Sequence, residues 1–200
     1  MKKVLIFFLL TTYIINAQKA TFGLKGGYNI IADNTTSLNQ INTNLKDKAS
    51  PNVSFLGGVF LNLEAISGFF IQPEVYFNQL RNDYKIGNES FSIINKRIDV
   101  PILFGKKISI IRFYAGPVFS TYLADKIMNT TIKSLKNEEF KVGLQYGVGI
   151  NLGKVVTLDA RYDHAISERT LEFFTTSEQF KTVNNRLGFI QLSVGYILFN

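Results

Sequence analysis

Every second residue is apolar over the thirteen positions from Phe140 to Leu152, FKVGLQYGVGINL. This alternation has the period of a β-strand with one apolar face and one face of small or polar residues. At ~3.3 Å per residue the stretch extends roughly 43 Å. When tilted by ~45° it covers about 30 Å, the thickness of the hydrocarbon core of a bilayer. Since an ordinary globular strand has about 5–6 residues, the stretch predicts a strand that crosses a membrane.

The start of the chain has the pattern of a secretory signal peptide. Met1-Lys2-Lys3 is basic, an apolar core continues to Ile15, and Ala17 is a small residue at the expected cleavage site. A membrane anchor is the alternative, but the apolar core is short and no stop-transfer pattern follows it. We therefore expect a signal peptide over residues 1–17 and a single barrel domain over residues 18–200.

The composition narrows the class of protein. The formal net charge is +7, but the basic residues are scattered and not gathered on one face, so a nucleic-acid partner is not expected. The chain has no cysteine, which excludes disulfides and thiolate metal sites. The 18 Phe, 9 Tyr and 15 Gly residues fit a β-rich envelope protein better than a cytosolic enzyme.

Similar alternation recurs along the chain and predicts eight strands. They are expected at residues 20–30, 52–63, 69–80, 94–105, 110–123, 140–152, 155–165 and 186–199. Pro73 cannot donate to a strand ladder, so an irregularity or bulge is expected there.

The connections between these strands alternate strictly between long and short. The long connections are polar and are expected to be loops at residues 31–51, 81–93, 124–139 and 166–185. Bacterial outer-membrane barrels have this rhythm, with short periplasmic turns, long extracellular loops and an even number of strands.

Alternation alone does not say which face points inward, because a soluble lipocalin-like barrel has the same period around an apolar interior. The polar face here is rich in Gly, Ser, Asn and Gln, whereas a face exposed to water usually has more Lys and Glu. The strands are also long enough to span a bilayer. We therefore expect an all-β fold, an eight-stranded antiparallel up-and-down transmembrane β-barrel with its polar face inside.

The polar face includes charged residues of both signs near the strand centres. Inside a small barrel such groups can pair, and an unpaired charge there would be costly. The expected interior polar network, structural in role, consists of Lys25, Glu74, Arg97, Asp99, Arg112, Asp159, Arg161 and Asp163. Because an eight-stranded barrel is just wide enough for its own side chains, no wide diffusion pore is expected.

No catalytic, cofactor-binding or metal site is expected. His164 is the one histidine and has no accompanying motif such as HExxH. We interpret it as a residue of the interfacial aromatic belt beside Tyr162. Asp159, Arg161 and Asp163 recur at period two and are interpreted as an internal salt-bridge ladder, in preference to an acid–base cluster.

Five short runs stand in order along the chain. They are Ile71-Gln72-Pro73-Glu74, Ile98-Asp99-Val100-Pro101-Ile102, Ala115-Gly116-Pro117, Asp159-Ala160-Arg161-Tyr162 and Ser193-Val194-Gly195-Tyr196. Together they resemble the PorT-like outer-membrane β-barrel family of Gram-negative bacteria over essentially the whole mature chain. The resemblance implies an eight-stranded barrel in the cell outer membrane, in contact with its lipid. The founding member of that family is linked to the type IX secretion system, which implies a role in secretion or surface assembly.

These observations favour a non-enzymatic outer-membrane protein with a structural or interaction role. The four long connections are the expected contact regions for a protein partner, because barrels carry recognition on their loops. The alternative is a barrel that binds or transports a small hydrophobic ligand, suggested by Leu56 and Phe60 on the inner face. A barrel-borne hydrolase is less favoured, since only the interior charges suggest it.

Overall fold

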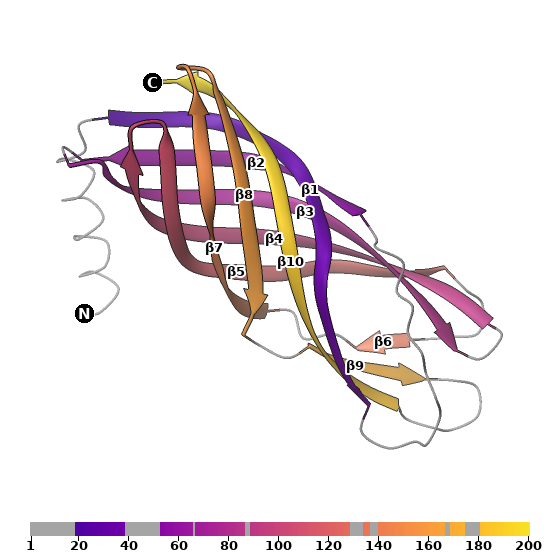
Figure 1. The fold of residues 1–200 in the computed structure, drawn as a ribbon. Coiled ribbons are helices and arrows are strands. Elements are labelled where there is room, and N and C mark those ends of the chain that lie inside the picture. The colour runs from indigo at the N-terminus through magenta and orange to yellow at the C-terminus, as the bar shows by residue number, and fades with distance from the viewer. Residues whose placement is uncertain are drawn as a thin grey trace, which may run out of the picture.

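The computed structural model describes residues 19–38, 53–65, 67–86, 89–128, 134–136, 140–166, 169–174 and 181–200. Within these ranges the chain forms strands joined by short turns, and Figure 1 shows the strands wrapped into a tilted barrel. None of the described residues belongs to a helix long and apolar enough to cross a membrane. The expected signal peptide, residues 1–17, lies outside the described ranges.

Eight long strands form the wall of the barrel. They are β1 (Lys19–Leu38), β2 (Val53–Glu64), β3 (Phe69–Ile86), β4 (Glu89–Ile108), β5 (Ile111–Met128), β7 (Phe140–Leu152), β8 (Val156–Ala165) and β10 (Lys181–Phe199). Each pairs antiparallel with the next in this order, and β1 pairs with β10, which closes the barrel. The expected eight-stranded up-and-down transmembrane architecture is confirmed.

Two further short strands were not predicted. They are β6 (Ser134–Lys136) and β9 (Arg169–Phe174). β9 pairs with the first residues of β10, and β6 pairs with β9. They extend the sheet beyond the closed wall, at the end of the barrel away from the C-terminus (Figure 1).

The end of the barrel that carries the C-terminus has the expected short turns. One of them depends on Gly68, whose φ of +77° lies in the left-handed region that glycine adopts without steric cost. The Gly68 carbonyl accepts a hydrogen bond of 2.8 Å from the Lys107 amide. A Cβ atom at position 68 would lie 2.7 Å from the Lys107 carbonyl oxygen. Glycine is therefore required both by the backbone angle and by the neighbouring turn.

The opposite end differs from the prediction. Residues 31–51, 81–93, 124–139 and 166–185 were expected to be loops, but the strands run far into these segments. β1 continues to Leu38, β3 and β4 remain paired up to Ile86 and Glu89, and β10 begins already at Lys181. The assignment of these four segments as loops throughout is therefore wrong.

The alternation of apolar residues marks only the part of a strand that lies in the bilayer. An apolar face is needed only where one side of the strand meets lipid and the other meets the lumen. Beyond the bilayer both faces meet water, while antiparallel pairing still satisfies the backbone N–H and C=O groups. Polar residues can therefore continue a strand in which the sequence no longer shows a period of two.

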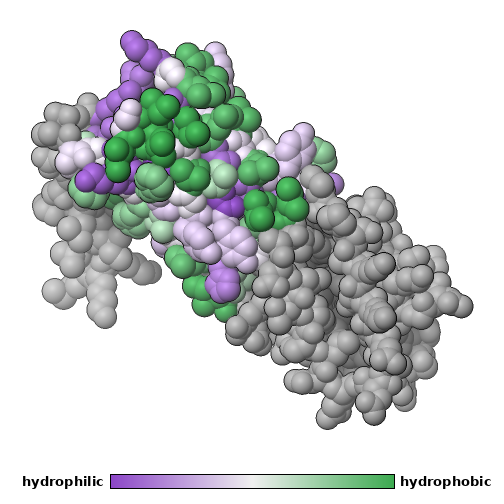
Figure 2. All heavy atoms as spheres, viewed as in Figure 1, coloured by the Kyte–Doolittle hydropathy of each residue, from purple (hydrophilic) through white to green (hydrophobic). Residues whose placement is uncertain are grey.

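Within the membrane-spanning part the two faces separate as expected. On β7, Lys141 and Gln145 are buried, whereas Tyr146 and Val148 are exposed on the outer face. On β10, Gln191 and Ser193 are buried between exposed apolar neighbours such as Leu192. Figure 2 shows hydrophobic side chains gathered over the outer face of the described wall. This outer face is suited to the hydrocarbon core of a bilayer, since barrel strands turn their apolar residues toward lipid.

Of the irregularity or bulge expected at Pro73, the structure shows an irregularity without a shift of register. Pro73 lies opposite Ile102 of β4, and after a gap at residues 74 and 75 the β3–β4 ladder resumes in the same register at Tyr76 and Asp99. The ladder between β2 and β3 is interrupted beside the proline but resumes in the same register. The irregularity is thus a gap in pairing, as expected for a residue without an N–H, and not a shift.

Candidate functional site in the barrel interior

All eight charged residues predicted for the interior lie on inner faces, each at most 8% exposed. The structure gathers them into two groups. The group called the central network here comprises Lys25, Glu74, Arg112, Asp159 and Arg161. The other, called the second cluster, comprises Arg97, Asp99 and Asp163.

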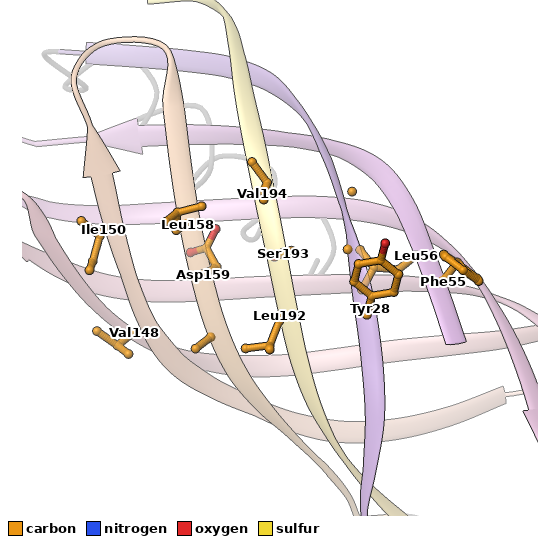
Figure 3. A pocket seen from close by; sticks show the side chains of 13 residues that line it. Tyr28, Phe55, Leu56, Val148, Ile150, Leu158, Asp159, Leu192, Ser193 and Val194 are labelled. Atoms are coloured by element: carbon orange, nitrogen blue, oxygen red, sulfur yellow. The ribbon is translucent and has the colours of Figure 1, made fainter. Parts of the chain in front are cut away.

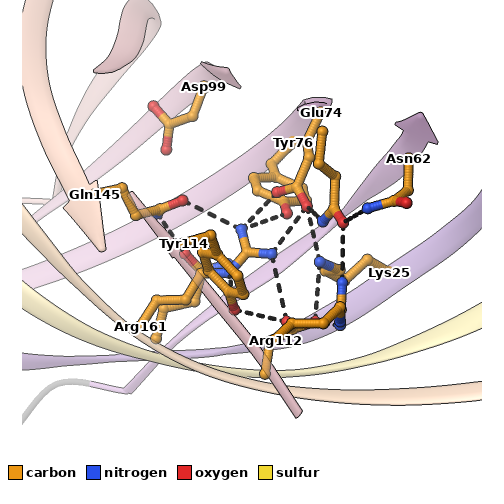
Figure 4. A network of polar contacts seen from close by, with 12 residues as sticks. Lys25, Asn62, Glu74, Tyr76, Asp99, Arg112, Tyr114, Gln145 and Arg161 are labelled. Atoms are coloured by element: carbon orange, nitrogen blue, oxygen red, sulfur yellow. Dashed lines mark hydrogen bonds and ion pairs between the residues drawn. The ribbon is translucent and has the colours of Figure 1, made fainter. Parts of the chain in front are cut away.

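The ion pair between Glu74 and Arg161 crosses the barrel. Arg161 belongs to β8 and Glu74 to β3, which lie four strands apart in either direction around the closed wall. The Arg161 Nη1 and Nη2 atoms donate to the two oxygens of Glu74 at 2.5 and 2.9 Å. Lys25 of β1 donates to Glu74 Oε1 at 2.8 Å. Figure 4 shows these side chains meeting in the lumen. Such two-point pairing fixes geometry as well as charge.

Asp159 is the second carboxylate of the central network. Its Oδ1 accepts hydrogen bonds from Arg112 Nη2 at 3.0 Å and from the Tyr114 hydroxyl at 2.6 Å. Its Oδ2 lies 3.0 Å from Lys25 Nζ, and its Oδ1 lies 3.7 Å from Arg161 Nη2. Three cations therefore converge on this one carboxylate.

Gly149 of β7 leaves the space in which this convergence occurs. A Cβ atom at position 149 would lie 2.5 Å from Asp159 Oδ1 and 2.8 Å from Arg112 Nη2. Both distances are too short for real contacts, so any side chain here would displace the ion pair. Gly149 thus has a specific role on the inner face of β7, which is to leave room for the ion pair between Arg112 and Asp159.

Neutral side chains complete the central network. Arg161 also donates to the Tyr76 hydroxyl at 2.9 Å, the Tyr114 hydroxyl at 3.0 Å and Gln145 Oε1 at 3.1 Å. Arg112 Nη1 donates to Gln72 Oε1 at 2.9 Å. The sequence places these residues on the inner faces by their register but does not indicate which charges they contact.

The second cluster lies farther from the short turns. Arg97 Nε lies 2.9 Å from Asp99 Oδ2, and Arg97 Nη2 lies 3.5 Å from Asp163 Oδ2. The Arg97 guanidinium also lies over the Phe189 ring, 5.1 Å from its centroid. Asn78 donates to Asp99 as well. Asp99 and Asp163 are therefore partnered by Arg97 and do not join the central network.

His164 lies apart from both groups. Its side chain is exposed on the wall, and its ring stacks on Tyr162 with centroids 6.4 Å apart. Tyr162 in turn packs against Tyr146, with centroids 5.5 Å apart. Among the described residues, no group of three or more histidine, aspartate or glutamate side chains is placed to hold a metal ion.

An apolar hollow of about 590 Å³ lies on the outer face of the wall, across β1, β2, β7, β8 and β10. Figure 3 shows Tyr28, Phe55 and Leu192 among the side chains around it. The rings of Tyr28 and Phe55 pack with centroids 5.1 Å apart. Tyr28, Phe55 and Leu192 point away from the lumen, so the hollow is open to lipid. Leu56, Asp159 and Ser193, which face inward, also border it.

Comparison with known proteins gives a family and a fold. A model of the family described as outer membrane protein beta-barrel domain matches residues 16–170. The crystal structure of OprG from Pseudomonas aeruginosa is similar, with a TM-score of 0.63 and 12% identity, covering 94% of this chain and 100% of that one. At this identity the similarity concerns the fold alone.

Two other outer-membrane structures are similar at lower scores. Outer membrane protein W of E. coli has a TM-score of 0.46 and 12% identity over 90% of this chain and 98% of that one. Ail from Yersinia pestis has a TM-score of 0.45 and 13% identity over 90% of this chain and 100% of that one. No curated protein sequence matches the chain.

Proposed function

The chain belongs to the family of outer membrane protein β-barrel domains, and from this premise we propose that it is a non-enzymatic outer-membrane protein with a structural or interaction role. The barrel lies in the lipid of the outer membrane. We propose also that residues 1–17 direct export and are removed, because they have the pattern of a signal peptide.

The observation that carries this proposal is the ion pair that crosses the lumen. Glu74 and Arg161 join opposite walls, and both side chains are fully buried. Tyr76 and Tyr114, each at most 5% exposed, fill the lumen beside them. Because the lumen is filled, we expect the protein to act through its exposed surfaces. Its interior carboxylates are engaged in ion pairs, which argues against a role as a hydrolase.

We place contact with a protein partner on the paired strand ends beyond the wall. The β3–β4 hairpin and the β10–β9–β6 sheet are backbone-paired, so they present a more rigid surface than loops of the same length. The resemblance of five sequence runs to the PorT-like family supports secretion or surface assembly as the process served.

A small hydrophobic ligand has less support. Leu56 and Phe60 do face inward, at 6% and 2% exposed, but the centre of the lumen is occupied by charged side chains. The apolar hollow on the wall opens toward lipid, where acyl chains can fill it.

Measuring conductance in planar lipid bilayers tests whether the lumen is closed to ions. The wild-type barrel is expected to give no stepwise current. A Glu74→Ala, Arg161→Ala double variant removes the crossing ion pair without changing the net charge, and it is expected to conduct. His164→Ala, on the outer face, is the matched control and should remain silent. Regular conductance steps from the wild type would contradict the proposal.

A further inference from the structure

A cavity of about 220 Å³ opens at the turn end of the lumen, below the central network. Its polar lining includes Lys19, Glu64, Lys107, Arg112, Lys154 and Thr157. We propose that this cavity binds a phosphate group, which is carried either by a phospholipid head or by free phosphate. The site does not depend on the partner contact proposed above.

The lining has an excess of positive charge. Four of its side chains are cationic and one, Glu64, is anionic. Lys107 Nζ pairs with Glu64 at 2.7 Å. Lys19 and Lys154 have no carboxylate partner among the described residues, so their charges are available to a ligand.

Arg112 and Thr157 belong to the cavity lining, and each has a donor atom that is enclosed by the surrounding side chains. Arg112 is 3% exposed and uses its Nη atoms on Gln72 and Asp159, but its Nε has no hydrogen-bond partner in the described part of the chain. Thr157 is 2% exposed, and its Oγ1 also has no partner there. Buried donors without partners are costly. Because both atoms are shielded from the open space of the cavity, the charges of Lys19 and Lys154 are the groups that would hold the ligand.

The charge of the central network, which shares Arg112 with the cavity lining, gives a further reason for an anion. The central network has three cations, Lys25, Arg112 and Arg161, and only two carboxylates, Glu74 and Asp159. A water molecule in the cavity would leave this surplus charge in place. A buried charge without a counter-ion is strongly destabilising.

The second cluster does not supply the missing negative charge. Asp163 is four residues beyond Asp159 on β8, roughly 13 Å farther from the turns at ~3.3 Å per residue. The buried Lys141 lies in the same row of the sheet as Asp99, through Ser120. Arg97 already partners both carboxylates of the second cluster, Asp99 and Asp163.

The size and position of the cavity favour a phosphate group over a larger anion. A volume of about 220 Å³ is below the ~300–1,000 Å³ of pockets for drug-sized ligands. The short turns of outer-membrane barrels face the periplasm. The mouth of the cavity therefore lies at the level of the phospholipid heads in the periplasmic leaflet of the outer membrane. It is also open to solutes of the periplasm.

Phosphorus-31 NMR of the folded barrel in a phosphate-free sugar detergent tests the site. Inorganic phosphate is the first probe. Dihexanoylphosphatidylglycerol, below its micelle concentration, is the second. Saturable line broadening or shift is expected with at least one probe. The Lys19→Gln, Lys154→Gln double variant is expected to weaken binding at least tenfold. Heat-dependent electrophoretic mobility verifies that each variant is folded.

Lys106→Gln is the matched control, because Lys106 lies near the same end but over the Phe69 ring, 4.8 Å from its centroid, outside the cavity lining. It should change binding by no more than twofold. Binding of the lipid probe identifies a phospholipid head as the source, and binding of inorganic phosphate alone identifies a free anion. No saturable signal with either probe, or an equal loss in Lys106→Gln, would overturn the proposal.

Discussion

Asp159→Asn is expected to lower the free energy of unfolding by about 3–5 kcal/mol, the cost of breaking a buried ion pair by removing one partner. The substitution preserves the shape of the side chain but leaves Lys25, Arg112 and Arg161 with Glu74 as their only carboxylate in the central network. Urea titration in lipid vesicles, with the folded fraction read from electrophoretic mobility without heating, measures this change.

Two comparisons show whether charge is the cause. Asp163→Asn removes a carboxylate that faces Arg97 at 3.5 Å, so a smaller loss of about 1–3 kcal/mol is expected. Adding Arg112→Met to Asp159→Asn removes one surplus cation and should recover about 0.5–3 kcal/mol, the range of coupling between contacting residues. Unchanged stability of Asp159→Asn would mean that the central network does not stabilise the barrel.

Leu192→Arg is expected to destabilise the barrel in lipid vesicles by about 2–4 kcal/mol, the cost of an arginine facing lipid near the middle of the bilayer. Leu192 is 45% exposed and pairs with Ala160 near the centre of β8. Leu152→Arg is the matched control, since Leu152 is 49% exposed but lies beside the 153–155 turn. There the expected cost falls to about 0–1 kcal/mol.

The difference in destabilisation between these two variants shows whether the outer face of the barrel meets lipid or water. On a barrel whose outer face met water, both arginines would be surface substitutions, usually within about 0.5 kcal/mol of the wild type. Equal and small effects from the same urea titration in vesicles would therefore contradict the assignment of this face to lipid.

The wall of the barrel could be predicted from the sequence because two different environments lie on its two sides. On β7, Gln145 is buried in a polar lumen while Tyr146 faces outward, so the period of two is visible. The strand ends beyond the wall could not be predicted in this way. Ser90 and Lys85 pair across the β3–β4 hairpin, but their segment lacks the lipid-facing alternation that marks a strand.

The members of the interior site could be predicted, but the contacts could not. Alternation places Glu74 and Arg161 on inner faces, and a small lumen makes pairing of such charges favourable. Their actual pairing depends on barrel closure, which brings together strands four positions apart in the wall. The cavity at the turn end likewise depends on closure, because Lys19 and Lys154 come from distant parts of the chain.

The central claim is that the chain forms an outer-membrane barrel with its paired strand ends outside the cell and its short turns in the periplasm. Cysteine labelling on cells tests this claim most directly. The chain has no cysteine of its own, so single Ser90→Cys and Lys154→Cys variants each give one reactive site. A membrane-impermeant maleimide is expected to label Ser90→Cys on intact cells and Lys154→Cys only after the outer membrane is permeabilised. Labelling of Lys154→Cys on intact cells, with Ser90→Cys protected, would contradict this orientation.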